Sequence, residues 1–325
     1  MRNIKSLFLA GTISIILYLL IFNFVVKKPL SLGFMFEAYQ KKMAYAKKAK
    51  SPKVVIVAGC NGFFSHRCEV MEKIVGMPCV NVSTTAELSI DFQLAKAKEI
   101  LFKGDIALLP IEYSTYTSDS KTIESSVANV YMTMYDKKML RQYGWKRRIN
   151  SSVYFNLKFL ISALGEMGLR AAGVSRRFSM DTLTPQGDMK DHTEEKGRAY
   201  RKFMVSEDQP APKKGFLQRK FQGELIVDDF LVWAKANGVM VVGSLPTVFN
   251  DYPVSDEVVQ RIRDIYLERG HEFILLPNRS QYDRSCFYDT AYHLNERCQI
   301  THSISVAHAL KKLLIEKNKI LSGHK

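Results

Sequence analysis

The sequence predicts an α/β protein: a three-layer α/β/α sandwich with a parallel sheet, preceded by one N-terminal transmembrane helix. Short β-branched runs that end at Gly or Pro alternate with amphipathic segments. This alternation is typical of parallel strands joined by right-handed helical crossovers. The chain has 325 residues, which is long enough to bury a full core. A long uncharged apolar run stands before these segments.

The apolar run covers Ser6 to Val26, SLFLAGTISIILYLLIFNFVV, and Lys27 and Lys28 follow it. About 20 apolar residues are enough to cross a bilayer as a helix. A cleaved signal peptide would have a shorter apolar region with a small-x-small site after it, and no such site is present here. We therefore expect an uncleaved single-span anchor over residues 1–28.

Residues 29–50 are expected to form a basic juxtamembrane stalk, helical from about Phe34 and lying near anionic headgroups. Its lysines are Lys41, Lys42, Lys47, Lys48 and Lys50. Counted by the positive-inside rule, the lysines on this side of the span favour a cytoplasmic main domain. The cysteines, discussed below, favour the opposite side.

The main domain is predicted over residues 51–325. Its expected strands are 53–59, 78–82, 105–113, 239–246 and 272–277, and its expected helices are 66–75, 85–102, 224–237, 255–269 and 302–319. The strands are nearly continuous apolar runs, as expected when both faces of a sheet are covered. The helices show apolar residues at spacings of three and four.

An insertion at about 115–222 interrupts this alternation. It is rich in Ser, Tyr, Arg and Lys, and we expect it to be largely helix and loop. Helices are expected at 127–141 and 153–169. The segment 182–214 carries Pro, Gly and many charges and is expected to be a long exposed loop.

The net charge of +15, from 47 Lys+Arg against 32 Asp+Glu, favours an acidic partner such as anionic lipid, an acidic polysaccharide or nucleic acid. No zinc-finger spacing, RNA-binding aromatic signature or basic heptad helix is present, so nucleic acid is not expected. The basic runs 146–148 and 176–177 are either contacts for an acidic glycan or solvated surface.

Candidate site residues follow the predicted strands, because ligands of open parallel sheets bind at the carboxyl ends of the strands. They are Cys60 and Asn61 after the first strand, Asn81 to Thr85, with Thr84, after the second, Glu112 and Tyr113 after the third, Thr247 to Asp251 after the fourth, and the segment beyond Pro277 after the last. Asn81 either lines the cleft or caps a turn. Glu112 and Tyr113 either contact substrate hydroxyls or tie the third strand to its neighbours.

The C-terminal segment SCFYDTAYHLNERC, residues 285–298, contains Asp289 and His293 in a polar loop. A carboxylate four residues from a histidine can orient the imidazole, which can then act as a general base. With Cys60 as the nucleophile, the three residues form a triad divided between the two ends of the chain.

These blocks resemble the SGNH/GDSL hydrolase superfamily. The likeness rests on the strand–GCN turn, on Lys103-Gly-Asp with its strand and Pro-x-Glu-Tyr, and on FYDTAYHLNERC with its helix. It covers about residues 51–113 and 239–315, and is closest to membrane-anchored, extracytoplasmic members found with polysaccharide-modification systems. The resemblance implies an SGNH-type sheet and an acyl-transfer site that needs no cofactor or metal.

Carried over by position, the resemblance puts the nucleophile at Cys60, the catalytic histidine at His293 and the triad aspartate at Asp289. This chain departs from the family in three ways. The aspartate stands four residues before the histidine rather than three, Ser83-Thr84-Thr85 lacks the oxyanion glycine, and Glu112 replaces an asparagine. A backbone N–H of Asn61 or Thr84 is then the candidate oxyanion donor, while a carboxylate at Glu112 would repel an oxyanion.

Three interpretations of Cys60 follow: an active nucleophile, a remnant in a site that only binds acylated glycan, or a small buried core residue. The five cysteines bear on this choice. A Cys286–Cys298 bridge would hold the Asp289/His293 loop, and a Cys68–Cys79 bridge would leave Cys60 unpaired. Disulfides require an oxidising compartment.

Two functions are therefore expected as alternatives. One is an inner-membrane-anchored, periplasmic SGNH-like acyltransferase or esterase that acts on acyl groups, acetyl above all, of a cell-surface or exported polysaccharide. The other is a catalytically inactive accessory protein that binds glycan, or a partner such as a membrane-bound acyltransferase, in a polysaccharide assembly complex.

Overall fold

The computed structural model describes residues 2–26, 30–124, 127–152, 157–173, 179–200, 204, 212 and 215–323. These residues form two units, and each is described by itself. The smaller unit contains residues 1–37 and 124–180, and the larger unit contains residues 38–123 and 181–325.

The larger unit is built on a five-stranded parallel sheet with the strand order β2-β1-β3-β4-β6. The strands are β1 (Val54–Ile56), β2 (Cys79–Asn81), β3 (Ile106–Leu109), β4 (Met240–Ser244) and β6 (Glu272–Ile274). Every predicted strand is present, with shorter ends, so the prediction of an α/β chain with a parallel sheet is confirmed. The chain adds β2 on one side of β1 and the later strands on the other side, so the strand order reverses between β1 and β3. Open α/β sheets bind their ligands at such a switch point.

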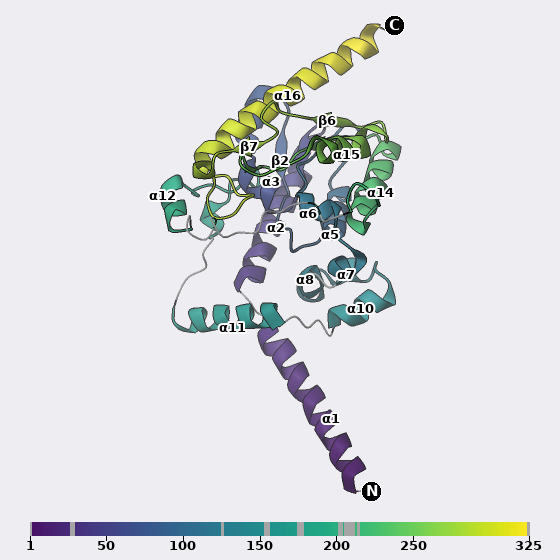
Figure 1. Ribbon diagram of the computed structural model, residues 1–325, viewed down its shortest axis with the longest axis vertical. Helices are drawn as coiled ribbons and strands as arrows, with labels where there is room; N and C mark the ends of the chain where they lie inside the picture. Colours follow the sequence, from purple (N-terminus) through teal and green to yellow (C-terminus); the bar gives the residue numbers. More distant parts are fainter. Residues whose placement is uncertain are drawn as a thin grey trace. The chain divides into compact units, whose positions relative to one another are not determined.

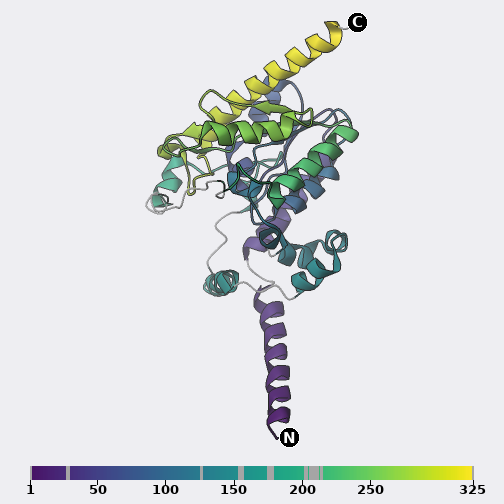
Figure 2. The same ribbon diagram turned by 45° about the vertical axis from the view of Figure 1, so that its right-hand side comes forward.

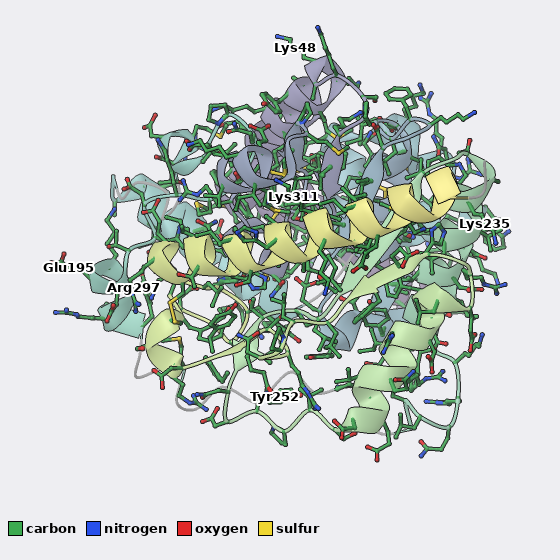
Figure 3. The ribbon with its side chains drawn as sticks, turned by 90° about the horizontal axis from the view of Figure 1, so that it is seen from above. Lys48, Glu195, Lys235, Tyr252, Arg297 and Lys311 are labelled. Carbon is green, nitrogen blue, oxygen red and sulfur yellow. A yellow bond between two sulfur atoms is a disulfide. The ribbon has the colours of Figure 1, made fainter. Side chains whose placement is uncertain are left out.

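Two helices, α4 (Cys68–Val75) and α16 (Glu296–Gly323), pack against the sheet. They share one apolar core with β1, β3, β4 and β6. Met71, Val306 and Leu310 pack there with Val54 and Ile56, whose alternate positions face the same side of the sheet. Figure 3 shows α16 running across this unit, with Lys311 on it. Helices α14 (Gln222–Ala236) and α15 (Asp256–Leu267) contact β4. The finer prediction of a three-layer sandwich stays a prediction.

The other elements of the larger unit are short. They are α3 (Cys60–Ser65), α5 (Ile90–Lys98), α6 (Tyr113–Tyr116), α7 (Ser120–Glu124), α12 (Glu194–Gly197), the 3-10 turns Arg198–Tyr200 and Arg284–Cys286, and the strand pair β5 (Val248–Phe249) and β7 (Gln281–Tyr282). The strand pair is not expected from the sequence, because runs of two residues give no alternation to read.

Several helices differ from their predicted bounds. The helix predicted over 127–141 is divided at Asp136, which caps α9 (Lys137–Leu140), and α4 begins at Cys68 rather than residue 66. Helix α5 begins at Ile90 rather than residue 85, because Thr85 to Ser89 form a turn that Gln93 holds by donating from Nε2 to the carbonyls of Thr85 (3.1 Å) and Leu88 (2.8 Å). Helix α16 begins at Glu296 rather than residue 302, with Cys298 inside its first turn.

The expectation of an exposed loop over 182–214 is wrong for its first part. Asp188, Met189 and His192 are all buried in the larger unit. Polar residues are buried here because protein groups satisfy them: the Asp188 carboxylate accepts from Thr184 Oγ1 (3.1 Å) and from the Cys68 amide (2.9 Å). Residues 201–203, 205–211 and 213–214 of this prediction lie outside the described part of the chain.

The smaller unit contains the apolar span. Helix α1 (Arg2–Ile21) continues into a π-helical turn, Phe22–Val26, and residues Ile4–Val26 make one helix long and apolar enough to cross a membrane. The unit also holds α8 (Val127–Tyr135), α9 (Lys137–Leu140), α10 (Trp145–Ser152) and α11 (Leu157–Ala171), and the chain passes into the larger unit within the 3-10 turn Met180–Thr182. In Figures 1 and 2, α11 lies crosswise to α1. The first residues of the predicted helix 153–169 lie outside the described part.

Helix α2 (Leu30–Lys48) takes the place of the predicted stalk. From Ala38 onward it belongs to the larger unit, where Tyr39 and Met43 are buried. Lys42 is only 1% exposed, so the expectation that it lies near lipid headgroups is wrong. The reason is its position: Lys42 lies three residues after Tyr39 and one before Met43, on the buried face of the helix.

Candidate functional site

Cys60 is the first residue of α3, on the short turn that follows β1, and it is half-buried. All five cysteines lie in the described residues: Cys68 pairs with Cys79, Cys286 pairs with Cys298, and Cys60 is the free thiol. The predicted pairing is confirmed. The residue before Cys60 has to be glycine, since a Cβ on Gly59 would lie 2.5 Å from Glu112 Oε1 and 2.9 Å from the amide nitrogen of Ala86.

Asp289 and His293 are in direct contact. His293 Nδ1 lies 2.6 Å from Asp289 Oδ1, and the two side chains are only 12% and 6% exposed. The four-residue spacing closes because the chain turns back on itself here. The Tyr288 amide donates to the His293 carbonyl (2.8 Å), and Phe287 forms an antiparallel bridge with Leu294. The loop therefore holds the carboxylate against one ring nitrogen and leaves the other nitrogen facing away.

The imidazole of His293 interacts electrostatically with Cys60. Burial alone lowers the pKa of His293, but attraction to a negative charge on Cys60, attraction to the Asp289 carboxylate and hydrogen bonding outweigh burial and raise this pKa to about 10. Nε2 of His293 makes no hydrogen bond of regular geometry to any described residue. Attraction to Cys60 and Asp289 therefore outweighs burial at this ring.

A short network fastens the His293 loop to α3. The backbone carbonyl of Tyr292 accepts hydrogen bonds from Ser65 Oγ (3.1 Å) and from Thr247 Oγ1 (3.2 Å). Asn61 joins the same network, with Nδ2 donating to Thr247 Oγ1 at 2.8 Å. The side chain of Asn61, a predicted substrate contact, is therefore used within the protein, and Thr247, between β4 and β5, brings three segments together.

Glu112 occupies the backbone amides beside Cys60. Its two carboxylate oxygens accept from the N–H groups of Asn61 (2.9 Å) and Gly59 (3.2 Å), and the residue is buried. Burial raises the pKa of Glu112, and the two amide hydrogen bonds and the nearby His293 offset part of this rise. The Asn61 N–H, one of two predicted oxyanion donors, is thus already bound to a carboxylate.

The second predicted donor is also engaged. The Thr84 N–H donates to the Ala58 carbonyl at 3.2 Å. The Thr84 hydroxyl, by contrast, is buried and has no hydrogen-bond partner among the described residues. The loop after β2 runs beside β1, and Thr84 belongs to the predicted oxyanion segment of that loop. Its hydroxyl is therefore a candidate oxyanion donor that no described residue already binds.

Asn81 holds the loop after β2 in place. Its Nδ2 donates to the Gly62 carbonyl (2.8 Å) and to Asp188 Oδ1 (3.0 Å), and its Oδ1 accepts from the Ser83 amide (3.1 Å). Every polar atom of this buried side chain therefore bonds to protein, including a turn contact two residues on.

Lys42 reaches the same loop from α2. Its ammonium donates to the Ser83 carbonyl and lies 3.5 Å from the centre of the Phe63 ring. Burial lowers the pKa of Lys42 well below its ordinary value, although the charge of Asp188 opposes this shift. The sequence does not identify Lys42 as a site residue, because a lysine in a lysine-rich helix is expected to lie on the surface.

Tyr113 is buried against Tyr252, with ring centroids 6.3 Å apart. The hydroxyls of both residues are buried without a hydrogen-bond partner in the described part of the chain. Burial raises the pKa of Tyr252 to about 12, and that of Tyr113 further. Two alternatives are open for Tyr113 from the sequence, contact with substrate hydroxyls or attachment of the third strand to its neighbours, and its burial favours the second.

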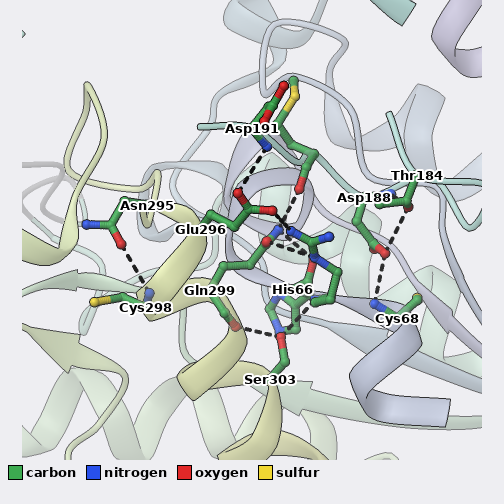
Figure 4. Close-up of polar contacts among 12 residues, drawn as sticks. His66, Cys68, Thr184, Asp188, Asp191, Asn295, Glu296, Cys298, Gln299 and Ser303 are labelled. Atoms are coloured by element: carbon green, nitrogen blue, oxygen red, sulfur yellow. Dashed lines mark hydrogen bonds and ion pairs between the residues drawn. The ribbon is translucent and has the colours of Figure 1, made fainter. Parts of the chain in front are cut away.

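Arg67 ties the segment after α3 to α16. Its amide donates to Ser303 Oγ (2.7 Å), its Nε donates to Gln299 Oε1 (3.1 Å), and its guanidinium pairs with Glu296. Gln299 in turn donates to the His66 carbonyl at 2.9 Å. Figure 4 shows these contacts with the bonds at Cys68 and Cys298, one cysteine from each disulfide. The network ties the segment after α3 to α16, the Cys286–Cys298 bridge ties the His293 loop to α16, and the Cys68–Cys79 bridge ties α4 to β2.

Other features lie elsewhere. A groove of about 600 Å³ between α14 and α15 is lined mainly by acidic side chains, and none of the candidate site residues lines it. Among the described residues no three His, Cys, Asp or Glu side chains group as metal ligands. In the basic run 146–148, Arg147 is buried and donates to Asn129 Oδ1 at 3.0 Å, so it is not a glycan contact. Residues 176–177 lie outside the described part.

No protein-family model matches this chain, and no curated protein matches it in sequence. The assignment of residue roles therefore depends on the geometry above.

Proposed function

We propose that this chain is a membrane-anchored acyl-transfer enzyme, an SGNH-like acyltransferase or esterase, in which Cys60 is the nucleophile, His293 the general base and Asp289 the residue that orients His293. The observation that carries the proposal is the placement of the His293 imidazole: its Nδ1 is held 2.6 Å from the Asp289 carboxylate, and its ring stacks at 4.0 Å on Phe64 of the helix that begins at Cys60. A nucleophile, a base and a residue that orients the base are the minimum for this chemistry.

In the proposed reaction, the Cys60 sulfur attacks the acyl carbonyl carbon while its proton resides on His293 Nε2. The carbon–oxygen bond to the donor alcohol breaks, His293 gives that oxygen the proton, and an acyl–thioester remains on Cys60. A hydroxyl of the acceptor, or water, then attacks the thioester as His293 takes its proton. The acyl–sulfur bond breaks, the acyl group leaves on the acceptor oxygen, and His293 returns the proton to the sulfur, which restores the free thiol.

The substrate class and the location belong to the same proposal. We assign the acyl group, acetyl above all, to a cell-surface or exported polysaccharide, on the resemblance to membrane-anchored SGNH proteins. Two disulfides support an oxidising compartment, and the apolar span Ile4–Val26 supports an inner-membrane anchor with the larger unit in the periplasm. A three-layer SGNH-type arrangement of the sheet and its helices is part of the proposal.

A second function, a catalytically inactive glycan- or partner-binding protein, is favoured by Glu112. A buried carboxylate on the two amides beside the nucleophile occupies donors that could otherwise stabilise an oxyanion. The enzyme proposal requires either that Glu112 is protonated during turnover or that other donors, such as the Thr84 hydroxyl, take this role.

The test is to incubate the full chain, in detergent micelles, with an activated acetyl ester and to follow intact mass. We expect one acetyl adduct that is absent in Cys60→Ala and slower to form in His293→Ala, which keeps the thiol. Cys60→Ser shows whether the remaining residues can activate an oxygen nucleophile. If no adduct and no turnover are seen with several acyl donors, while glycan binding is retained, the binding function replaces the enzymatic one.

A further inference from the structure

Helix α11 exposes an apolar stripe on one side. Leu157, Ile161 and Leu164, at spacings of four and three, are 60%, 61% and 50% exposed. Their spacing puts them on one face of the helix. The opposite side, at Ala163, is buried. A helix on a water-exposed surface normally buries its apolar face and exposes its polar one. In α11 the apolar face is exposed instead.

A second helix of the same unit repeats the pattern. Trp145 and Ile149, four residues apart on α10, are 63% and 55% exposed. Exposed basic residues flank the apolar ones on both helices: Lys146 and Arg148 on α10, Lys158 and Arg170 on α11. Apolar side chains bordered by Lys and Arg, with a Trp among them, are the composition of helices that lie in the headgroup region of a bilayer.

Helix α11 contacts the end of the apolar span, and this contact indicates what covers its exposed apolar stripe. Helix α11 packs against Phe22–Val26, the last turn of the span, where Phe22 and Val26 are buried. The contact continues just beyond the span, where the Ser31 amide and hydroxyl donate to Glu166 Oε2 at 3.0 and 3.2 Å. Figures 1 and 2 show α11 crossing the end of α1 at this point. Most of α1 itself is exposed along its length.

We propose that α10 and α11 form an interfacial platform, with the stripe Leu157, Ile161, Leu164 and the pair Trp145, Ile149 inserted into the boundary between headgroups and hydrocarbon of the membrane that the span crosses. The inference rests on the proposed membrane anchor. The occupant is lipid, because a helix fixed crosswise to the last turn of a span lies at the depth where the hydrocarbon ends. The flanking Lys and Arg side chains then reach anionic headgroups.

The test places one nitroxide label at a time on the full chain in vesicles that contain anionic lipid. In a Cys60→Ser background, which removes the free thiol, Ile161→Cys puts the label in the stripe, and Ser162→Cys puts it on the adjacent polar flank as the matched control. Collision with oxygen, which concentrates in hydrocarbon, is compared with collision with a water-soluble nickel chelate. We expect the oxygen-to-nickel ratio to be several-fold higher at position 161 than at 162.

A second readout uses the two tryptophans, Trp145 and Trp233. In Trp233→Phe the remaining Trp145 should be quenched by brominated lipid, whereas Trp233, alone in Trp145→Phe, should not. Equal water access at 161 and 162 with no quenching of Trp145 would overturn the platform. So would a label at 161 that is shielded from both reagents, since a protein partner or a second copy would then cover the stripe. Extraction of the chain by alkaline carbonate would instead remove the anchor on which the inference rests.

Discussion

The imidazole of His293 stacks on the ring of Phe64, with ring centroids 4.0 Å apart and ring planes inclined by 10°. Phe64 belongs to α3, the helix that starts at Cys60, and His293 belongs to the loop before α16. The stack therefore couples the nucleophile helix to the loop that carries the base. An imidazole held on one face by a ring and at Nδ1 by a carboxylate has little freedom to rotate, which leaves Nε2 in a fixed direction.

We expect Phe64→Leu to slow acetylation of Cys60, by up to about 10²-fold, because a displaced base costs rate even when every reacting group is present. The rate of adduct formation by intact mass measures this. Phe92→Leu, at a buried ring on α5, is the matched control: it should lower stability by a similar amount and leave the rate unchanged. Equal rate losses in both variants would show that the Phe64 ring serves only packing.

Asp289→Asn should lower the pKa of His293 from about 10, since the Asp289 charge and hydrogen bond both raise it. Titration of His293 by nitrogen-detected NMR measures the shift. The same variant should acylate about 10²–10⁴-fold more slowly, because an amide can hold the imidazole in the wrong tautomer. An unchanged pKa would show that Asp289 does not bear a charge next to the ring.

Glu112→Gln should accelerate acylation at neutral pH, up to about 10²-fold, the amount that one oxyanion donor contributes. An amide has one acceptor oxygen where the carboxylate has two, so the N–H of Gly59 or Asn61 becomes available, and the negative charge is removed. The acylation rate is compared with that of the parent chain once circular dichroism shows equal secondary structure. A slower Glu112→Gln variant would show instead that the carboxylate is needed for the site.

The two disulfides provide a matched pair, with sequence separations of 11 and 12 residues. Replacing either pair by serines should lower the free energy of unfolding by about 3 kcal/mol, the value for loops of this size. Only the Cys286/Cys298 change should also broaden the NMR signals of His293, because that bridge closes the loop that carries it. Equal effects on His293 from the Cys68/Cys79 change would contradict a local role.

Lys42 gives a pH dependence. The pKa of Lys42 is lower in the folded state than in the unfolded chain. Between these two pKa values the unfolded chain binds more protons at Lys42 than the folded chain does. The contribution of Lys42 to stability therefore increases as pH rises toward its ordinary pKa. In Lys42→Met this contribution is absent. The free energy of unfolding of Lys42→Met minus that of the parent should therefore decrease between pH 7 and pH 10. Urea titrations in micelles at several pH values measure it, and a constant difference would show that Lys42 is charged in the folded state.

Part of the site could be predicted from the chain alone. Buried runs such as 53–59 and 105–113 are long enough to identify as strands, and Cys60 and Glu112 follow from where those strands end. The pairing of Cys286 with Cys298 could be predicted because the two residues bracket one short loop. The role of Glu112 could not be predicted, because its partners are backbone amides, which have no signature in sequence.

The parallel sheet, the apolar span, the unpaired thiol and the Asp289/His293 loop could be predicted from the sequence, because each depends on local hydrophobic pattern or short spacing. Which groups meet in the site follows only from the folded chain. Folding buries Lys42 against the loop after β2, places Phe64 under the imidazole and puts the Glu112 carboxylate on the amides beside Cys60. These contacts join segments far apart in the chain, and their energy comes from burial and from charges in a low-dielectric interior, which no local pattern encodes.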